Sequence, residues 1–435
     1  MSAINAPQSF TVTNPRGQQV TVSPKRADEA AEIDANHDGV CSDAEIVDYM
    51  RARDILHGGP AQGNIPRLTE EFKSHLTGER VLTAAANGKD YRSLAQLEAR
   101  MHELAADHPD RCQLISIGRT VEGRDIWALK VSSDAQGDTS NKPGALFTGA
   151  HHAREWMTPE VTLGLAEDMV EHYNDNPEMK RRVDSAETWF IPVANPDGFA
   201  YTQTEDNMWR KNRTPIIDPK HPNSGPIGYG VDLNRNYWDG KPEHLSMYRH
   251  DGDTPESTWD DYGASDSVGS DAYRGQGPAT EKEVQALIAF ENGRSNIHGV
   301  IDHHSYGNLI MRPWDDRPGG PENVKDYDEV AGRMLKAQGK NPYQYIQTYD
   351  LYPTTGASVS FHQVSGRFGF GIEMGDSFQP PFKEFPGLYK TMSGADFAFL
   401  DWIIEKFPAT SPAPAPTPAP APQPAPAPPN PPTQV

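Results

Sequence analysis

The chain has 435 residues, a formal net charge of −21 and a hydrophobic fraction of 36%. Such a charge repels polyanions, which argues against nucleic acid and anionic membranes as partners. No apolar run reaches the ~20 residues of a membrane-spanning helix, and the two cysteines, Cys41 and Cys112, are too few for a thiolate zinc cluster or a disulfide scaffold. Residues 1–7 have neither a basic start nor an apolar block, so we expect no signal peptide in this sequence.

Composition divides the chain into three parts. Residues 1–87 are a polar leader, residues 88–407 have the pattern of a globular domain, and residues 408–435 are mainly alternating alanine and proline. An Ala/Pro-rich segment cannot form a core, so we expect the last part to be a disordered, extended tail.

One segment of the leader, residues 34–45, follows the spacing of an EF-hand calcium loop. Oxygen donors stand at its first, third and fifth positions, glycine at the sixth and glutamate at the twelfth. The resemblance to an EF-hand implies a small helical leader that binds Ca²⁺ through five residues: Asp34, Asn36, Asp38, the carbonyl of Val40, and Glu45. EF-hand loops usually pair, and we find no second loop. An acidic helix-turn-helix that binds no metal therefore stays open as the alternative.

From residue 91 onward, predicted strands and helices alternate. Short runs rich in β-branched and aromatic residues predict strands, and periodic apolar faces predict helices. We expect strands at residues 112–116, 125–131, 145–148, 188–193, 298–303 and 368–373, and helices at residues 93–107, 159–173, 280–291, 328–338 and 391–407. The helix at 280–291 carries a capping pattern, with Thr280 ahead of Glu283. The alternation predicts an α/β fold with a mixed, largely parallel central sheet flanked by helices.

Three side chains that could bind a metal or act as a base lie at the ends of predicted strands. His152 follows one strand, His304 follows a second, and Glu373 ends a third. Ligands of open α/β sheets bind beyond the carboxyl ends of the strands. We therefore expect these three side chains at one edge of the sheet.

Histidine pairs at two of these strand ends leave the metal ligands ambiguous. Either member of His151/His152 and either member of His303/His304 could be a ligand, and any single histidine could instead be a hydrogen-bonded core residue. Glu155 stands three residues after His152. With a distant histidine it completes a His-Glu-His set, which leaves one tetrahedral position for water and is typical of catalytic zinc.

Further motifs make the sequence similar to the zinc metallocarboxypeptidases of the M14 family, from about residue 90 to about residue 407. In chain order the motifs are HARE at 152–155, NPDGF at 195–199, WRKN at 209–212, DLNRN at 232–236, HSY at 304–306, Tyr352 and Glu373. The resemblance implies a metallocarboxypeptidase-like α/β fold with one bound Zn²⁺. It also implies an extracellular, secreted enzyme that acts on peptide or protein C-termini, and we expect a monomer.

The resemblance implies the ligands of that zinc ion. They are His152, Glu155 and His304, the second member of each histidine pair. Asp232 matches the family's carboxylate that holds a ligand histidine in place, which fixes the ring tautomer and raises ligand basicity.

The resemblance also assigns the catalytic and substrate-binding side chains. Glu373 matches the family's general base and acid, and Arg210 matches the donor that stabilises the developing oxyanion. The substrate's terminal carboxylate would be bound by a clamp of three side chains, with one further basic residue nearby: Asn234, Arg235 and Tyr352, and then Arg154.

Side-chain specificity should depend on residues 351–361. The position that lines the floor of the family's pocket is Val359, and no carboxylate stands between Leu351 and Phe361. We therefore expect release of neutral, apolar or aromatic C-terminal residues. Two other functions stay open: a family relative that cleaves bacterial cell-wall or γ-glutamyl peptides, and a non-catalytic, calcium-responsive binding protein.

Overall fold

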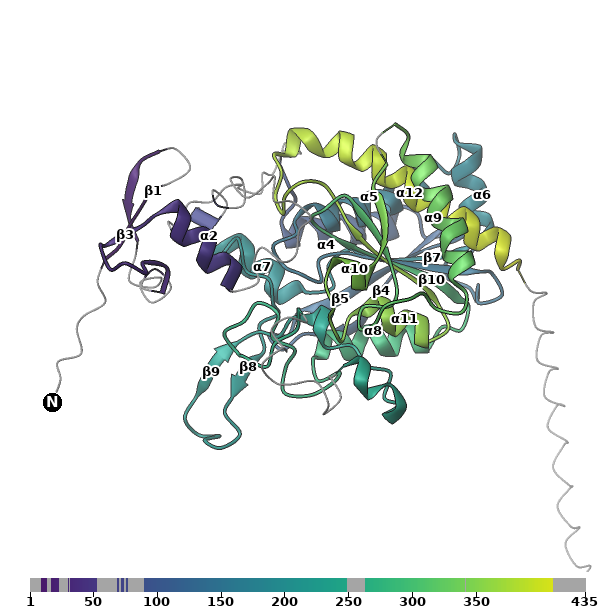
Figure 1. Ribbon diagram of the computed structural model, residues 1–435. Helices are drawn as coiled ribbons and strands as arrows, with labels where there is room; N and C mark the ends of the chain where they lie inside the picture. Colours follow the sequence, from purple (N-terminus) through teal and green to yellow (C-terminus); the bar gives the residue numbers. More distant parts are fainter. Residues whose placement is uncertain are drawn as a thin grey trace, which may run out of the picture.

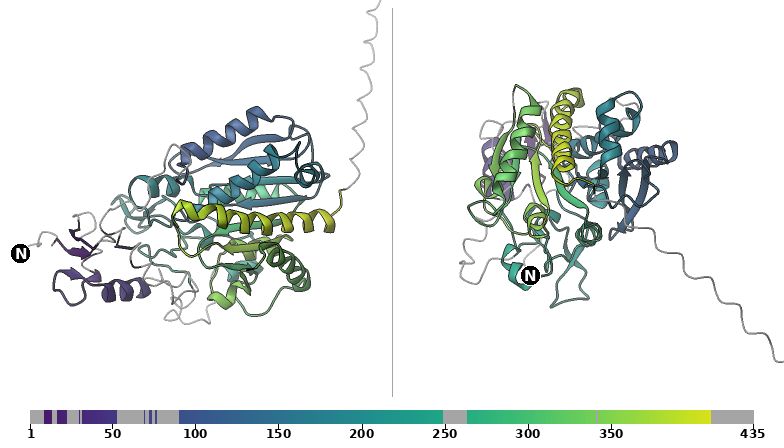
Figure 2. Two further views of the ribbon diagram at one scale, coloured as in Figure 1. Left: turned by 90° about the horizontal axis from the view of Figure 1, so that it is seen from above. Right: turned by 90° about the vertical axis from the view of Figure 1, so that its right-hand side faces the viewer.

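A central eight-stranded sheet forms the framework of the globular part of the chain, and helices cover both of its faces (Figures 1 and 2). The computed structural model describes residues 9–13, 17–22, 30, 32–52, 69, 72–73, 76, 90–248, 263–340 and 342–409. The expected Ala/Pro tail lies almost wholly outside the described residues.

The strand order is β12-β11-β13-β10-β6-β7-β5-β4. The four central strands, β13, β10, β6 and β7, run parallel to one another, whereas β11 and β5 are antiparallel to their inner neighbours. The expected mixed, largely parallel sheet is therefore confirmed. The strands are β4 (Cys112–Arg119), β5 (Asp125–Val131), β6 (Gly144–Thr148), β7 (Glu187–Ile191), β10 (Ile297–His304), β11 (Leu309–Arg312), β12 (Gln344–Gln347) and β13 (Phe368–Glu373).

Two apolar cores lie on opposite faces of the sheet. Side chains alternate along a strand, so Phe147 belongs to the core shared with α4, α5, α9 and α12, whereas Leu146 belongs to the core shared with α8 and α11. The helices are α4 (Leu94–Asp107), α5 (Met157–Glu171), α6 (Pro177–Ser185), α7 (Pro196–Thr204), α8 (Lys282–Asn292), α9 (Val324–Gln338), α10 (Thr348–Leu351), α11 (Ser358–Val364) and α12 (Phe385–Lys406). Shorter elements are β8 (Pro215–Ile217), β9 (Pro226–Tyr229) and the 3₁₀ turns η3 (Leu233–Arg235), η4 (Pro242–Met247) and η6 (Phe382–Glu384).

The capping pattern expected at α8 is wrong. The helix begins after Glu281, with no side-chain cap. Thr280 donates its hydroxyl to the carbonyl of Gly277 instead. Glu283 is fully buried and accepts a hydrogen bond from Asn212, so its carboxylate is turned toward the interior rather than back toward the start of the helix.

The leader contains strands as well as helix, so its expected all-helical character is incomplete. Its described elements are β1 (Thr11–Thr13), β2 (Gln19–Thr21), β3 (Val40–Cys41) and α2 (Asp43–Ala52), and the strands form a sheet in the order β2-β1-β3. Strands of two or three residues are too short to produce a periodic signal. β3 lies inside the EF-hand-like loop and pairs in parallel with β1, an upstream strand of the leader.

An apolar cluster joins the leader to the globular part. Phe10, Ile33 and Ile46 of the leader belong to the same buried cluster as Tyr306 and Phe378, which lie beside the carboxyl ends of the central strands. Figure 1 shows the leader in purple at one side of the sheet.

Cys41 and Cys112 are free, buried thiols, so they form no disulfide. None of the described helices has both the length and the apolar character needed to span a membrane.

Candidate metal centre and substrate cleft

The sheet register brings the expected strand-end residues together. β6, β10 and β13 are neighbours and run parallel, so their carboxyl ends meet at one edge. His304 and Glu373 are register partners at the ends of β10 and β13, and His152 lies in the loop that follows β6. The cleft at this edge is lined by side chains from strands, helices and loops, among them His152, Arg154, Glu155, Arg210, Asn234, Arg235, Asp271, His304, Met311, Tyr352, Ser358, Val359, Glu373 and Phe378.

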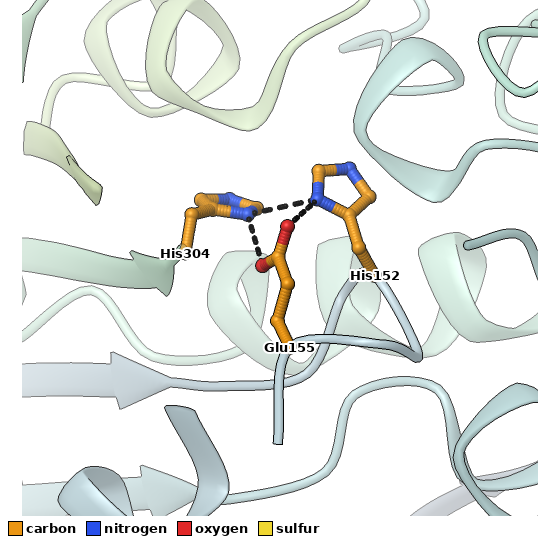
Figure 3. Close-up of side chains that lie close together, drawn as sticks. All are labelled: His152, Glu155 and His304. Carbon is orange, nitrogen blue, oxygen red and sulfur yellow. Dashed lines mark hydrogen bonds and ion pairs between the residues drawn. The ribbon is translucent and has the colours of Figure 1, made fainter. Parts of the chain in front are cut away.

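Three of these side chains converge on one point (Figure 3). Nδ1 of His152 lies 2.8 Å from Oε1 of Glu155, and Nδ1 of His304 lies 3.2 Å from Oε2 of the same carboxylate. The two Nδ1 atoms are 3.2 Å apart. Among the described residues, this is the one group of three or more His, Cys, Asp or Glu side chains close enough to share a metal ion.

The donor set fits zinc. Zinc–nitrogen bonds of ~2.0–2.1 Å in a tetrahedral arrangement place two ligand nitrogens ~3.3 Å apart, close to the 3.2 Å between the two Nδ1 atoms. Burial lowers the pKa of both histidines below the usual value, to about 4 for His304, which leaves the rings neutral as metal ligation requires. Two neutral rings whose acceptor nitrogens face each other beside a carboxylate repel, and a shared cation relieves that repulsion.

The other member of each histidine pair points elsewhere. Nε2 of His151 lies 2.8 Å from the hydroxyl of Tyr237, and Nδ1 of His303 lies 2.9 Å from the hydroxyl of Thr162. Both rings are fully buried and held by these partners. The geometry therefore separates the two members of each pair, which sequence periodicity alone left open.

Asp232 connects the metal centre to Arg210. One carboxylate oxygen lies 3.1 Å from Nε2 of His152, on the ring edge away from the metal-facing nitrogen. The other oxygen accepts from Nε of Arg210 at 2.9 Å. Although Asp232 is buried, the charge of Arg210 and the hydrogen bond to the His152 ring lower the pKa of this carboxyl well below its usual range, so it stays ionised. A carboxylate in this position orients the ring and the guanidinium together.

Glu373 lines the cleft, as do the three candidate metal ligands His152, Glu155 and His304. Its Oε2 atom is buried and has no hydrogen-bond partner among the described residues. Burial and the neighbouring Glu155 raise the pKa of Glu373 well above its usual range, and the nearby Arg210 and Arg235 partly oppose that shift. A carboxyl of this kind can accept a proton and return it.

Arg235, Asn234 and Tyr352 lie together on the cleft wall. The Arg235 guanidinium donates to the carbonyls of Gly263 and Asn234 and to the hydroxyl of Tyr352 at 3.1 Å. Gly356 permits this packing, because its φ is +74° and a Cβ there would lie 2.2 Å from the carbonyl oxygen of Arg235. The three side chains that the family resemblance assigns to a carboxylate clamp thus share one site.

Arg154 and Val359 occupy different parts of the cleft. Arg154 is 4% exposed, donates to Asp271 at 2.9 Å and stacks over the ring of Phe378 at 4.2 Å. Its charge is therefore already paired with a carboxylate of the protein. Val359 is buried on α11 and lines the pocket wall.

Sequence reasoning missed several cleft residues. Asp271, Met311 and Phe378 line the cleft, and Asp315 contacts its wall by accepting a hydrogen bond from the backbone of Ala357 at 3.2 Å. None of them lies in a motif of its own, and each reaches the site only through the folding of distant segments.

The EF-hand-like loop is closed by its own carboxylates. Asp34 accepts from the backbone nitrogens of Asp38 and Gly39 at 3.1 and 2.9 Å. Glu45 accepts from the backbone nitrogens of Asn36 and Ser42 at 3.3 and 3.0 Å. The helix that follows the loop is α2 (Asp43–Ala52), whereas most of residues 26–33, which precede the loop, lie outside the described residues.

Comparison with protein families places these residues in a known context. Residues 97–392, well over half of the chain, match the family model described as zinc carboxypeptidase, peptidase family M14. Metallocarboxypeptidase A of Trichophyton tonsurans is 32% identical over 281 residues, which cover 63% of this chain and 60% of that protein. Carboxypeptidase B of Rattus norvegicus is 30% identical over 340 residues, which cover 77% of this chain and 74% of that protein.

Solved structures share the fold. Thrombin-activatable fibrinolysis inhibitor matches with a TM-score of 0.63 and 23% identity over 74% of this chain and 80% of that one. Carboxypeptidase A of Helicoverpa armigera matches with a TM-score of 0.62 and 21% identity over 79% of this chain and 81% of that one. These likenesses confirm the α/β fold. The matched segment spans about 60% of the length of the first curated relatives.

The geometry predicts which histidine of each pair binds zinc. His152→Gln and His304→Gln should each lose stoichiometric zinc, whereas the matched variants His151→Gln and His303→Gln should keep it. Zinc at ~1,000 times its dissociation constant stabilises the folded chain by ~4 kcal/mol, so the first two variants should also lose the zinc-dependent rise in Tm. Metal analysis and thermal unfolding with and without a chelator measure both effects. Zinc retained in His152→Gln but lost in His151→Gln would reverse the assignment.

Proposed function

We propose, from the premise that the chain belongs to the zinc carboxypeptidase family, that it hydrolyses the C-terminal peptide bond of peptides or proteins. His152, Glu155 and His304 would hold the zinc ion, which when bound supplies Lewis-acid catalysis of the hydrolysis. The observation that carries the proposal is the shared cleft. The three candidate zinc ligands lie there together with the free Oε2 atom of Glu373 and the Arg235 guanidinium.

The side chains of the cleft divide the chemistry among themselves. Glu373 takes a proton from the attacking water and passes it to the leaving amine, for which its free Oε2 atom is suited. Arg210, fixed by Asp232, stabilises the charge that develops on the scissile carbonyl oxygen. Arg235, Asn234 and Tyr352 bind the substrate's terminal carboxylate, which selects the last peptide bond of the chain.

We expect Glu373→Gln to lower kcat by about 10²–10⁴, because a positioned general base contributes a factor of that order. Release of the C-terminal residue from an N-blocked dipeptide measures the effect. Zinc content should not change, since Glu373 is not one of the three ligands. The matched control is Glu384→Gln, which is exposed on η6. Activity of Glu373→Gln within about tenfold of the wild type would contradict this mechanism.

The pocket is proposed to accept neutral side chains. Its wall at Ala357, Ser358 and Val359 carries no charge. Asp315 accepts a hydrogen bond from the backbone of Ala357 at that wall, and burial together with the neighbouring Asp316 raises the pKa of Asp315 well above its usual range. A protonated carboxyl offers no charge to pair with a lysine or arginine side chain, so burying such a side chain here would be costly.

We therefore expect kcat/KM for substrates that end in Phe or Leu to exceed that for Lys or Arg by about 100-fold, because an unpaired buried cation costs several kcal/mol. Four N-blocked dipeptides that differ only in the last residue provide the comparison. Faster release of Lys or Arg would contradict the neutral pocket. The variant Asp315→Asn then identifies the cause: loss of Lys and Arg release in that variant would show that Asp315 supplies the charge.

The leader carries a separate proposal, that the loop of residues 34–45 binds Ca²⁺. Its oxygen donors are Asp34, Asn36, Asp38, the carbonyl of Val40, and Glu45. In the closed loop Glu45 is occupied by backbone nitrogens, so binding requires this side chain to exchange those hydrogen bonds for the ion. We also propose that the chain has three parts: the leader at 1–87, the catalytic domain at 88–407 and the Ala/Pro tail at 408–435. The enzyme is proposed to be secreted.

Calcium at about 100 times its dissociation constant should stabilise the wild type by ~2.7 kcal/mol. Glu45→Gln removes the ligand of the twelfth position and should abolish the calcium-dependent rise in Tm. Asp48→Asn, on the same helix but outside the loop, is the matched control and should retain it. An identical calcium response in wild type and Glu45→Gln, or no response in either, would argue for the metal-free alternative.

A further inference from the structure

A buried charged network lies behind the pocket wall. His362 on α11 stands between two carboxylates: its Nδ1 is 3.0 Å from Oε2 of Glu291, near the end of α8, and its Nε2 is 2.8 Å from Oδ2 of Asp302 on β10. All three side chains are 1% exposed. None of them belongs to a motif that the sequence singled out.

His362 is held as a cation. Each ring nitrogen faces a carboxylate oxygen, so both nitrogens donate, which only the imidazolium form can do. Burial opposes the charge, but Glu291 and Asp302 together raise the pKa of His362 to about 10. Removing one partner of such a buried group leaves the others uncompensated, which costs much more than breaking a pair on the surface.

Asp302 connects the His362 network to a residue of the substrate cleft. The same Oδ2 atom that faces His362 also accepts the hydroxyl of Ser358 at 2.5 Å. Ser358 lines the cleft at the start of α11, four residues before His362 and next to Val359. The other oxygen of Asp302 accepts from Thr148 on β6, so the carboxylate cannot turn away from Ser358 without losing a second hydrogen bond.

Ser358 in turn sets the orientation of Asn234. Its backbone N–H donates to Oδ1 of Asn234 at 2.9 Å. With that oxygen engaged, the amide nitrogen is on the other side, 3.3 Å from Nε2 of His304. The amide therefore presents its donor to the cleft, which is the orientation that a bound carboxylate needs.

We propose that His362 is a positioning residue for recognition of the substrate's terminal carboxylate, acting through Asp302, Ser358 and Asn234. This inference rests on the proposed function, in which Asn234 belongs to the carboxylate clamp. The charge of His362 holds Asp302 in place, Asp302 holds the Ser358 hydroxyl, and the Ser358 backbone holds the Asn234 amide. A merely structural role would lower stability without weakening carboxylate recognition in particular.

The first test separates KM from kcat. His362→Gln can keep one hydrogen bond but not the charge, so we expect KM to rise about tenfold while kcat changes by less than about threefold, in line with the loss of one hydrogen bond of ~1.4 kcal/mol. Ser358→Ala removes the last side-chain link and should raise KM to a similar degree. His298→Gln, half-buried at the start of β10, is the matched control and should change neither constant.

A double-mutant cycle tests the chain of contacts. If His362 acts through Ser358, adding His362→Gln to Ser358→Ala should raise KM by less than about twofold more, since the link is already broken. If KM of the double mutant instead rose by the product of the two single-mutant effects, the proposal would be overturned. Ser358→Ala alone gives a decision even where His362→Gln does not fold, because an unchanged KM in that variant would also overturn it.

A binding measurement distinguishes this proposal from the proposed function. In a Glu373→Gln background, a peptide with a free C-terminal carboxylate should bind much more tightly than the same peptide as a C-terminal amide. His362→Gln should reduce that ratio about tenfold by weakening only the carboxylate form. Equal ratios with and without His362→Gln would overturn the positioning role. No difference between acid and amide in either protein would instead contradict the carboxylate clamp itself.

Discussion

Two imidazole nitrogens and a carboxylate that face one another in a buried space constrain the rest of this molecule. Nδ1 of His152 and Nδ1 of His304 are 3.2 Å apart, and each lies within 3.2 Å of Glu155. Neutral rings so placed repel each other, and a shared cation makes the arrangement favourable. The strand order around β13, β10 and β6 serves this convergence, because three parallel neighbours deliver their carboxyl-terminal residues to one edge.

Local charge in the cleft differs from the charge of the chain as a whole. The net charge of −21 argues against polyanionic partners, yet three arginines line the cleft: Arg154, Arg210 and Arg235. The three arginines differ in the kind of group that each one contacts. Arg154 and Arg210 each pair with a carboxylate, whereas Arg235 contacts backbone carbonyls and the Tyr352 hydroxyl. Among the described residues, Arg235 is thus the cleft arginine without a direct ion pair to a carboxylate, and it is the one assigned to the substrate's carboxylate.

The large elements of the fold follow from local sequence. β5 and β13 have the predicted bounds, because both are apolar runs bounded by charged or glycine-rich segments. The main helices were found from their periodic apolar faces, with ends that differ by a few residues. Short elements were not predicted, such as β11 with four residues and α10 with four. Their stability comes from tertiary packing rather than from a periodic pattern of their own.

The residues of the candidate site also differ in whether local sequence could predict them. Residues in dense motifs, such as His152 and Glu155, could be predicted from the sequence with the family resemblance. Side chains that reach the site through long-range contacts could not: Asp302 and His362 are 60 residues apart in the chain, and Asp271 meets Arg154 across 117 residues. Nothing in the local sequence of His362 distinguishes it from other histidines, because its charge depends on two carboxylates brought together by folding.

A C-terminal ladder assay on a mixed peptide library, with and without a chelator, tests the central claim most directly. We predict stepwise loss of single residues from free C-termini, no cleavage of peptides with amidated C-termini, full inhibition by the chelator and recovery on addition of zinc. Cleavage at internal bonds, or release of residues that continues in the presence of the chelator, would contradict the assignment of this cleft as a zinc carboxypeptidase centre.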